Sequence, residues 1–138
     1  MNALVLDAST ILGLVLKDEH SSSTAKLIEA LEKRSAVYVP THWWIEVVNG
    51  LLMAERRKRL SGEELPEAID YIREFPMIVD DQTATRCEGD TLVLARRYKL
   101  TIYDTAYLEL AMRRKSKLAT IDKALARAAA DAGVESLI

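Results

Sequence analysis

Residues 3–10 read ALVLDAST, and this stretch is the clearest indication of the fold class. Its first four residues form a continuous apolar run, which is typical of a strand buried on both faces, and Asp7 follows directly. Ala8, Ser9 and Thr10 follow it, and then a helical run, so Asp7 stands at a strand-to-helix junction. Ligands of parallel sheets bind outside the carboxyl ends of the strands. The stretch therefore predicts a parallel sheet and places an acid at its functional edge.

The rest of the chain alternates short apolar runs with helical patterns. Further strands are expected at residues 36–39, 76–79 and 117–120, with a weaker run, VESLI, at residues 134–138. Helices are expected over about residues 24–33, after a cap at Thr41, after a capping box of Ser61 and Glu64, from Asp81 or Thr83 to Tyr98, from Asp104 to Arg114, and from Asp122 to Ala132 with Gly133 closing it. This alternation predicts a three-layer α/β/α fold with a mostly parallel central sheet.

Length and composition indicate one globular domain. The chain has 138 residues, of which 49% are hydrophobic and 29% are charged. A chain of this length buries roughly two-thirds of its unfolded surface in one core, so we expect a single domain over residues 1–138. The formal charge of −2 supplies no overall attraction to nucleic acid, so any contact with RNA has to be local.

No targeting segment is evident in the sequence. The first residues lack the basic start and the small-residue cleavage site of a secretory signal, and no apolar stretch is long enough for a membrane span. Cys87 is the only cysteine, which excludes an intramolecular disulfide and fits a reducing compartment. We therefore expect a cytoplasmic protein that does not bind membranes.

Four acidic residues stand where predicted elements begin or end: Asp7, Glu46, Asp104 and Asp122. Two carboxylates about 4 Å apart repel each other by roughly 4 kcal/mol at an effective dielectric near 20, and a divalent cation would remove that repulsion. The sequence has neither a histidine cluster nor a Cys-x-x-Cys motif, so a zinc site is disfavoured. Carboxylate oxygens favour Mg²⁺ or Mn²⁺ instead.

Each acid also has an ordinary structural interpretation. Asp7, Asp104 and Asp122 precede helices, where aspartate is a common N-cap. Glu46 differs, because it falls inside a helix beside its apolar face, and a partly buried acid needs a partner. The remaining acids, Asp80 among them, are expected on solvated surface.

Four motifs, taken in this order, resemble the PIN-domain ribonucleases, specifically the VapC toxins of VapBC toxin–antitoxin pairs: VLDAST, HWWIEVVNGLL, YDTAYLELA and LATIDKALARAAADAGV. The resemblance spans nearly the whole chain, and the family's acids fall on Asp7, Glu46, Asp104 and Asp122. It implies an endoribonuclease with one or two Mg²⁺ (or Mn²⁺) ions, held mainly by Asp7 and Asp104. The expected products carry 5′-phosphate and 3′-hydroxyl ends.

Three further residues are expected to orient the carboxylates. The family pattern places a hydroxyl residue beside the first acid and another just before the last, which are Ser9 and Thr120 here. Asn49 lies one helical turn after Glu46. The alternative role for Thr120 is to cap the following helix. His42 is expected either to stack on a base or assist a proton transfer, or to be an ordinary boundary residue.

The resemblance also implies partners: an RNA substrate, a cognate VapB-type antitoxin and a second copy of the chain in a homodimer. Basic runs at residues 56–59 and 113–117 are candidates for holding RNA near an acidic site, although cations also complement the ends of helices.

Two other functions are compatible with parts of the pattern. The first is a catalytically silent PIN-fold domain that binds RNA or protein without cutting. The second is a phosphatase of the haloacid-dehalogenase type, which uses an aspartate at the end of the first strand. That class has a second aspartate two positions later, where this chain has Ser9, so the phosphatase is disfavoured.

Overall fold

Four parallel strands form the central sheet of this chain, whose computed structural model describes residues 3–16, 22–33 and 36–138. Their order across the sheet is β3-β2-β1-β4. The strands are β1 (Ala3–Leu6), β2 (Ala36–Val39), β3 (Met77–Val79) and β4 (Lys117–Ala119). The weak run at residues 134–138 contributes one bridge, from Ser136 to Leu118, rather than a strand.

Strand β1 lies in the middle of the sheet and is covered on both faces. Leu4, Val5 and Leu6 are all buried, with at most 3% of each exposed, although successive strand residues point to opposite faces. Burying each such side chain stabilises the fold by roughly 1.5–3 kcal/mol. The continuous apolar run therefore predicted the central strand correctly.

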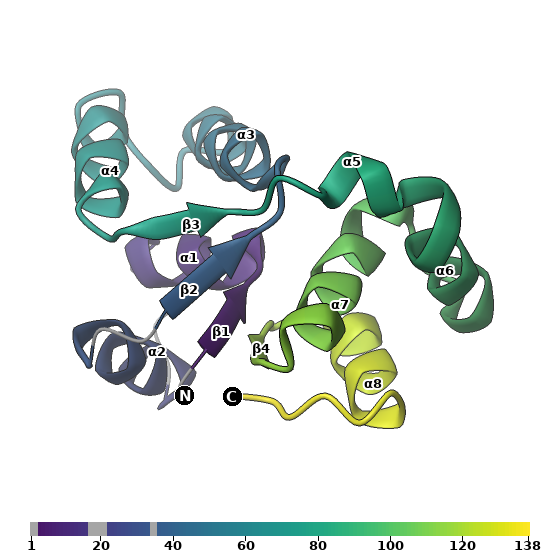
Figure 1. Cartoon of the computed structure of the whole chain (residues 1–138). Coiled ribbons are helices and arrows are strands. Elements are labelled where there is room, and N and C mark those ends of the chain that lie inside the picture. Colours follow the sequence, from purple (N-terminus) through teal and green to yellow (C-terminus); the bar gives the residue numbers. More distant parts are fainter. Residues whose placement is uncertain (1–2, 17–21, 34–35) are drawn as a thin grey trace.

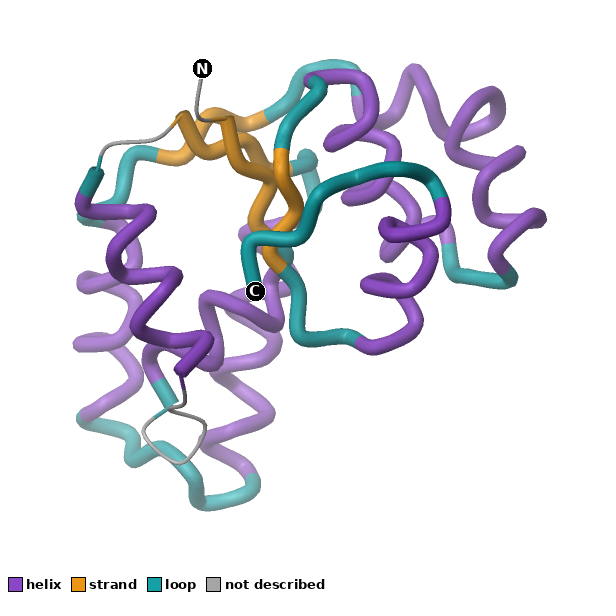
Figure 2. The backbone as a smooth tube through the Cα atoms, turned by 90° about the horizontal axis from the view of Figure 1, so that it is seen from below, coloured by secondary structure: helices purple, strands orange, loops and turns teal. Residues whose placement is uncertain are grey.

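Helices cover both faces of the sheet (Figure 1). They are α1 (Ala8–Val15), α2 (Ser22–Glu32), α3 (Trp43–Arg56), α4 (Glu64–Arg73), α5 (Thr83–Arg86), α6 (Leu92–Tyr98), α7 (Ile102–Arg114) and α8 (Lys123–Asp131). Helix α1 lies behind the sheet in Figure 1, and Figure 2 shows the strands between helices on either side. The prediction of a three-layer α/β fold is confirmed. Among the described helices, none is both long and apolar enough to cross a membrane.

Two helix ends follow the predicted local chemistry. The hydroxyl of Ser61 accepts from the Glu64 N–H at 3.0 Å, and the Glu64 carboxylate accepts from the Ser61 N–H at 2.9 Å, which confirms the capping box. Gly133 has φ +80° just after α8, and the next N–H, of Val134, donates to the Ala129 carbonyl at 2.8 Å. This is a Schellman ending, which requires a left-handed residue and therefore favours glycine.

Two other helix predictions are wrong. Thr41 does not cap α3; its hydroxyl donates to the Asp80 carbonyl at 2.9 Å, and His42 occupies the N-cap position. The helix expected to end at Tyr98 is broken by a π-helical segment (Cys87–Thr91) that separates α5 from α6. Gly89 has non-helical dihedrals in that segment, which accounts for the break.

The strand order creates a switch point between β1 and β4. From β1 the chain moves to β2 and then β3 on one side, and it later returns to place β4 on the other side of β1. The carboxyl ends of the strands at such a switch point are the usual ligand position in parallel sheets. Asp7 follows β1 directly, and Thr120 follows β4 directly.

A buried ionic cluster joins the end of β3 to α7. Both guanidinium nitrogens Nη1 and Nη2 of Arg113 donate to the Asp80 carboxylate, at 2.9 and 2.8 Å, and its Nε donates to Glu109 at 2.9 Å. Asp80 is only 2% exposed, so its expected place on solvated surface is wrong. Arg113 is committed to this cluster and is not available to hold RNA.

Replacing Arg113 by methionine should lower the free energy of unfolding by about 3–5 kcal/mol, because two buried carboxylates would lose their cation. Urea denaturation measures this change. The matched control is Arg96→Met on the exposed side of α6, which should change stability by less than about 0.5 kcal/mol. Equal losses in the two variants would show that the cluster contributes no net stability.

Candidate active site

Asp7 lies at the carboxyl end of β1 and caps α1. Its Oδ1 accepts hydrogen bonds from the hydroxyls of Ser9 and Thr10, both at 2.7 Å, and from the Thr10 N–H at 3.0 Å. Its Oδ2 accepts from the Thr120 hydroxyl at 2.5 Å. Burial raises the pKa of Asp7, and these hydrogen bonds lower it without cancelling the rise. Asp7 is thus a rigidly held carboxylate for which ionisation is costly.

Thr120 connects the carboxyl ends of β1 and β4. Its hydroxyl donates to Asp7 and accepts from the Asp122 N–H at 3.0 Å. Asp122 itself caps α8, since its Oδ1 accepts from the Leu125 N–H at 2.9 Å. The capping role considered for Thr120 therefore belongs to Asp122, and Thr120 contacts the Asp7 carboxylate directly.

Asp104 lies in the first turn of α7 without capping it. The helix begins at Ile102, and Thr101 is the cap, because its hydroxyl accepts from the Asp104 N–H at 3.1 Å. The pKa of Asp104 is raised, first by burial and then by the negative charges of Asp122, Glu46 and Asp7. Four carboxylates from distant parts of the chain thus share one electrostatic environment.

Glu46 lies one turn into α3 with its carboxylate half buried. Its Oε1 accepts from the Tyr107 hydroxyl at 2.6 Å and lies 3.2 Å from Nε2 of His42. Burial raises the pKa of Glu46, but the hydrogen bonds from His42 and Tyr107 and the charge of His42 outweigh burial and lower it overall. Sequence reasoning assigned no role to Tyr107, which lies 61 residues away along the chain.

The donor set fits a hard divalent cation. All four acids offer oxygen, and after burial it is the negative charges of the other three that raise the pKa of Asp104, as expected of carboxylates gathered around an ion. Within the described ranges, no three His, Cys, Asp or Glu side chains are already arranged to hold a metal ion. Mg²⁺ commonly binds through one or two carboxylates and keeps several waters, so it does not require such a cage.

The remaining predicted residues differ in their contacts. Ser9 donates to Asp7, which agrees with an orienting role. Asn49 is exposed one turn after Glu46, and no hydrogen bond joins the two side chains, so its role stays a prediction.

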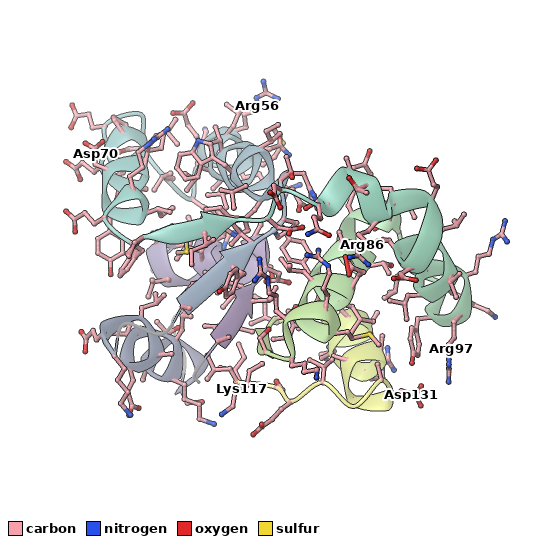
Figure 3. All side chains as sticks on the ribbon, viewed as in Figure 1. Arg56, Asp70, Arg86, Arg97, Lys117 and Asp131 are labelled. Carbon is pink, nitrogen blue, oxygen red and sulfur yellow. The ribbon has the colours of Figure 1, made fainter. Side chains whose placement is uncertain are left out.

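The basic residues lie at varied distances from this edge of the sheet. Lys117 begins β4, so it lies at the amino end of the strand, opposite Thr120, and near the C-terminal end of the chain (Figure 3). Arg56 lies ten residues after Glu46 on the same helix, about 15 Å along its axis. It projects outward in Figure 3. A role in RNA binding stays a prediction for residues 56–59 and for the run at 113–117 apart from Arg113, which is bound to Asp80 and Glu109.

Comparison with known proteins identifies relatives of the whole chain. The PIN domain family model matches residues 4–131. Ribonuclease VapC3 of Pyrobaculum aerophilum is 28% identical over 89% of this chain and 92% of its own length. Ribonuclease VapC3 of Mycobacterium tuberculosis is 30% identical over 91% of this chain and 86% of its own length.

Two crystal structures share the fold. PAE2754 from Pyrobaculum aerophilum aligns with a TM-score of 0.62 at 21% identity, covering 92% of this chain and 86% of that one. VapBC2 from Rickettsia felis, bound to a DNA fragment from the promoter of the pair, aligns with a TM-score of 0.64 at 16% identity. That alignment covers 91% of this chain and 92% of the other.

The raised pKa of Asp104 predicts a stability change when its charge is removed. The ionised form of Asp104 is disfavoured in the folded state. Ionised Asp104 therefore lowers the free energy of unfolding above its folded pKa, and this destabilisation disappears as the pH falls through the ordinary carboxyl range. Without metal at pH 7, Asp104→Asn should therefore raise the free energy of unfolding by about 0.5–2 kcal/mol. The gain should shrink towards pH 4.

Urea denaturation at both pH values measures this effect. Asp70→Asn is the matched control, since Asp70 is exposed on α4 and projects away from the body of the molecule (Figure 3). A destabilised Asp104→Asn variant, or one that behaves like Asp70→Asn, would contradict the charge clustering.

Proposed function

The chain belongs to the PIN-domain family and to its VapC ribonucleases, and from this we propose that it is a metal-dependent endoribonuclease, the toxin of a type II toxin–antitoxin pair. The observation that carries the proposal is that acids distant in the sequence meet at the carboxyl edge of β1. Thr120 donates to the Asp7 carboxylate and accepts from the Asp122 N–H. The pKa of Asp104 is raised first by burial and then by the charges of Asp122, Glu46 and Asp7. These acids lie at the switch point of the sheet, which is the usual ligand-binding position in open α/β sheets.

We assign catalysis to Asp7, Glu46, Asp104 and Asp122. Asp7 and Asp104 would be the main ligands of Mg²⁺ or Mn²⁺, with Glu46 and Asp122 assisting. When bound, such a cation supplies Lewis-acid chemistry, because it lowers the pKa of water and neutralises charge on the phosphodiester. Hydrolysis of that kind does not need the 2′-hydroxyl of RNA and leaves 5′-phosphate and 3′-hydroxyl ends.

The contribution of the chain is to hold its carboxylates in fixed places. Asp7 accepts its hydrogen bonds from Ser9, Thr10 and Thr120, so its side chain loses little freedom when it binds. Asp122 is fixed by its capping bond. Such pre-organisation lowers the entropic cost of assembling the reactive arrangement.

Partners complete the proposal. RNA is the substrate, and cations beside the site must offset the repulsion between its phosphates and the acids. A VapB-type antitoxin is the expected inhibitor, and the fold shared with VapBC2 of Rickettsia felis supports that expectation. A homodimer is the expected assembly. We place the protein in the cytoplasm as one domain over residues 1–138, and the family match over residues 4–131 supports that extent.

Substituting Asp7 by asparagine should reduce RNA cleavage by more than about 100-fold, because loss of a principal metal ligand should cost more than loss of a residue that only orients one. The assay incubates the antitoxin-free protein and Mn²⁺ with total cellular RNA and sequences the fragment ends. EDTA should abolish the same cuts, and Asp70→Asn should leave them unchanged.

Thermal unfolding of each variant shows whether loss of activity reflects loss of structure. Cuts that persist at normal rate in Asp7→Asn would remove this residue from the site. If the folded wild-type protein binds Mn²⁺ and RNA but makes no cuts, the silent PIN-fold alternative is favoured.

A further inference from the structure

The carboxylate of Glu46 is held by two side chains to which the proposed function gives no role. The Tyr107 hydroxyl donates to Oε1 at 2.6 Å, and Nε2 of His42 lies 3.2 Å from the same oxygen. In the part of the chain that the structure describes, no donor reaches Oε2. One oxygen of Glu46 is therefore fixed by the protein and the other is available.

Tyr107 can act only as a hydrogen-bond donor towards Glu46. Burial raises the pKa of its hydroxyl far above the ordinary value, and the hydrogen bond to Glu46 and the charges of Glu46 and Asp7 raise it further. The side chain is 2% exposed, so the hydroxyl has no access to bulk water in place of Glu46. A buried hydroxyl of this kind keeps its proton and its partner.

His42 is also fixed as a donor. Its Nε2 lies 3.1 Å from the main-chain carbonyl oxygen of Tyr103 and 3.2 Å from Oε1 of Glu46. A carbonyl and an ionised carboxylate can only accept, so Nε2 must carry the hydrogen. The ring meets Tyr103 and Tyr107 edge-on, with centroids 5.8 and 5.5 Å apart.

These contacts link α3 to α7. His42 and Glu46 are four residues apart at the start of α3, and Tyr103 and Tyr107 are four residues apart on α7, so each pair presents neighbouring side chains. Asp104 directly follows Tyr103. The contacts among these four residues thus position the Glu46 carboxylate of α3 relative to Asp104 of α7.

We propose that Tyr107 and His42 are positioning residues that hold Oε1 of Glu46 and thereby direct Oε2 towards the divalent cation. This inference rests on the proposed function, because it requires a cation at the acidic site. Partners that orient metal ligands change metal affinity by about 10–100-fold when they are lost.

Removing one oxygen atom tests the inference. Tyr107→Phe keeps the buried ring and loses the donor, so Mn²⁺ should bind about 10–100-fold more weakly in isothermal titration calorimetry. Tyr98→Phe is the matched control, because the Tyr98 hydroxyl also donates to a carboxylate, that of Asp131, at 2.8 Å on the exposed surface. Mn²⁺ affinity in that variant should equal that of the wild type.

A double-mutant cycle separates positioning from general packing. If Tyr107 acts through Glu46, Tyr107→Phe should weaken Mn²⁺ binding in the wild-type background and have little further effect in Glu46→Gln. Weakening by the same factor in both backgrounds would overturn the inference, as would unchanged affinity in Tyr107→Phe. If the wild type binds no Mn²⁺, the proposed metal site fails and this inference fails with it.

His42 offers a second test at a position with a less buried side chain, 20% exposed. His42→Ala should weaken Mn²⁺ binding, whereas His42→Gln retains an N–H donor and should preserve most of the affinity. Equal losses in the two variants would overturn the role assigned to His42. These variants keep the inference testable if Tyr107→Phe does not fold.

Discussion

Carboxylates repel each other at one edge of the sheet, and the surrounding structure has to oppose that repulsion. Burial raises the pKa of Asp104 and of Asp7, and the charges of Asp122, Glu46 and Asp7 raise that of Asp104 further. A fold that gathers these groups loses stability unless a cation is present, so the surrounding structure has to hold them in place. The buried strand β1, the switch point beside β4 and the hydrogen bonds to Asp7 do so.

The same residue types behave differently elsewhere in the molecule. Asp80 is also buried, and burial alone would raise its pKa, but hydrogen bonds from Arg113 and Thr83 and the charge of Arg113 lower it overall. The Asp80 carboxylate is paired with the Arg113 guanidinium, and this ion pair has a structural role. For Asp104, by contrast, like charges add to the effect of burial. Acids that a fold gathers without a matching cation are candidates for binding one, and this contrast distinguishes the acidic site from the ionic cluster.

Local patterns predicted what local chemistry determines. The sequence allowed three local features to be predicted, because each depends on residues within a few positions: the apolar run before Asp7, the capping box of Ser61 and Glu64, and the glycine after α8. The hydroxyls beside Asp7 came from family resemblance. The contacts that were missed join distant residues: Arg113 with Asp80, 33 positions apart, and Tyr107 with Glu46, 61 apart. Thr41 failed as a cap for the same reason, since Asp80 accepts from its hydroxyl. Such partners leave no periodic signal in the sequence.

Anomalous diffraction from crystals soaked in Mn²⁺ can show whether these acids bind one or two divalent cations together. We expect a manganese peak at the carboxyl edge of β1, bonded to Asp7 and Asp104, with Oε2 rather than Oε1 of Glu46 facing the ion or one of its waters. A well-diffracting crystal of protein that cuts RNA but shows no manganese there, or shows it only at other acids, would rule out a shared metal site at these residues.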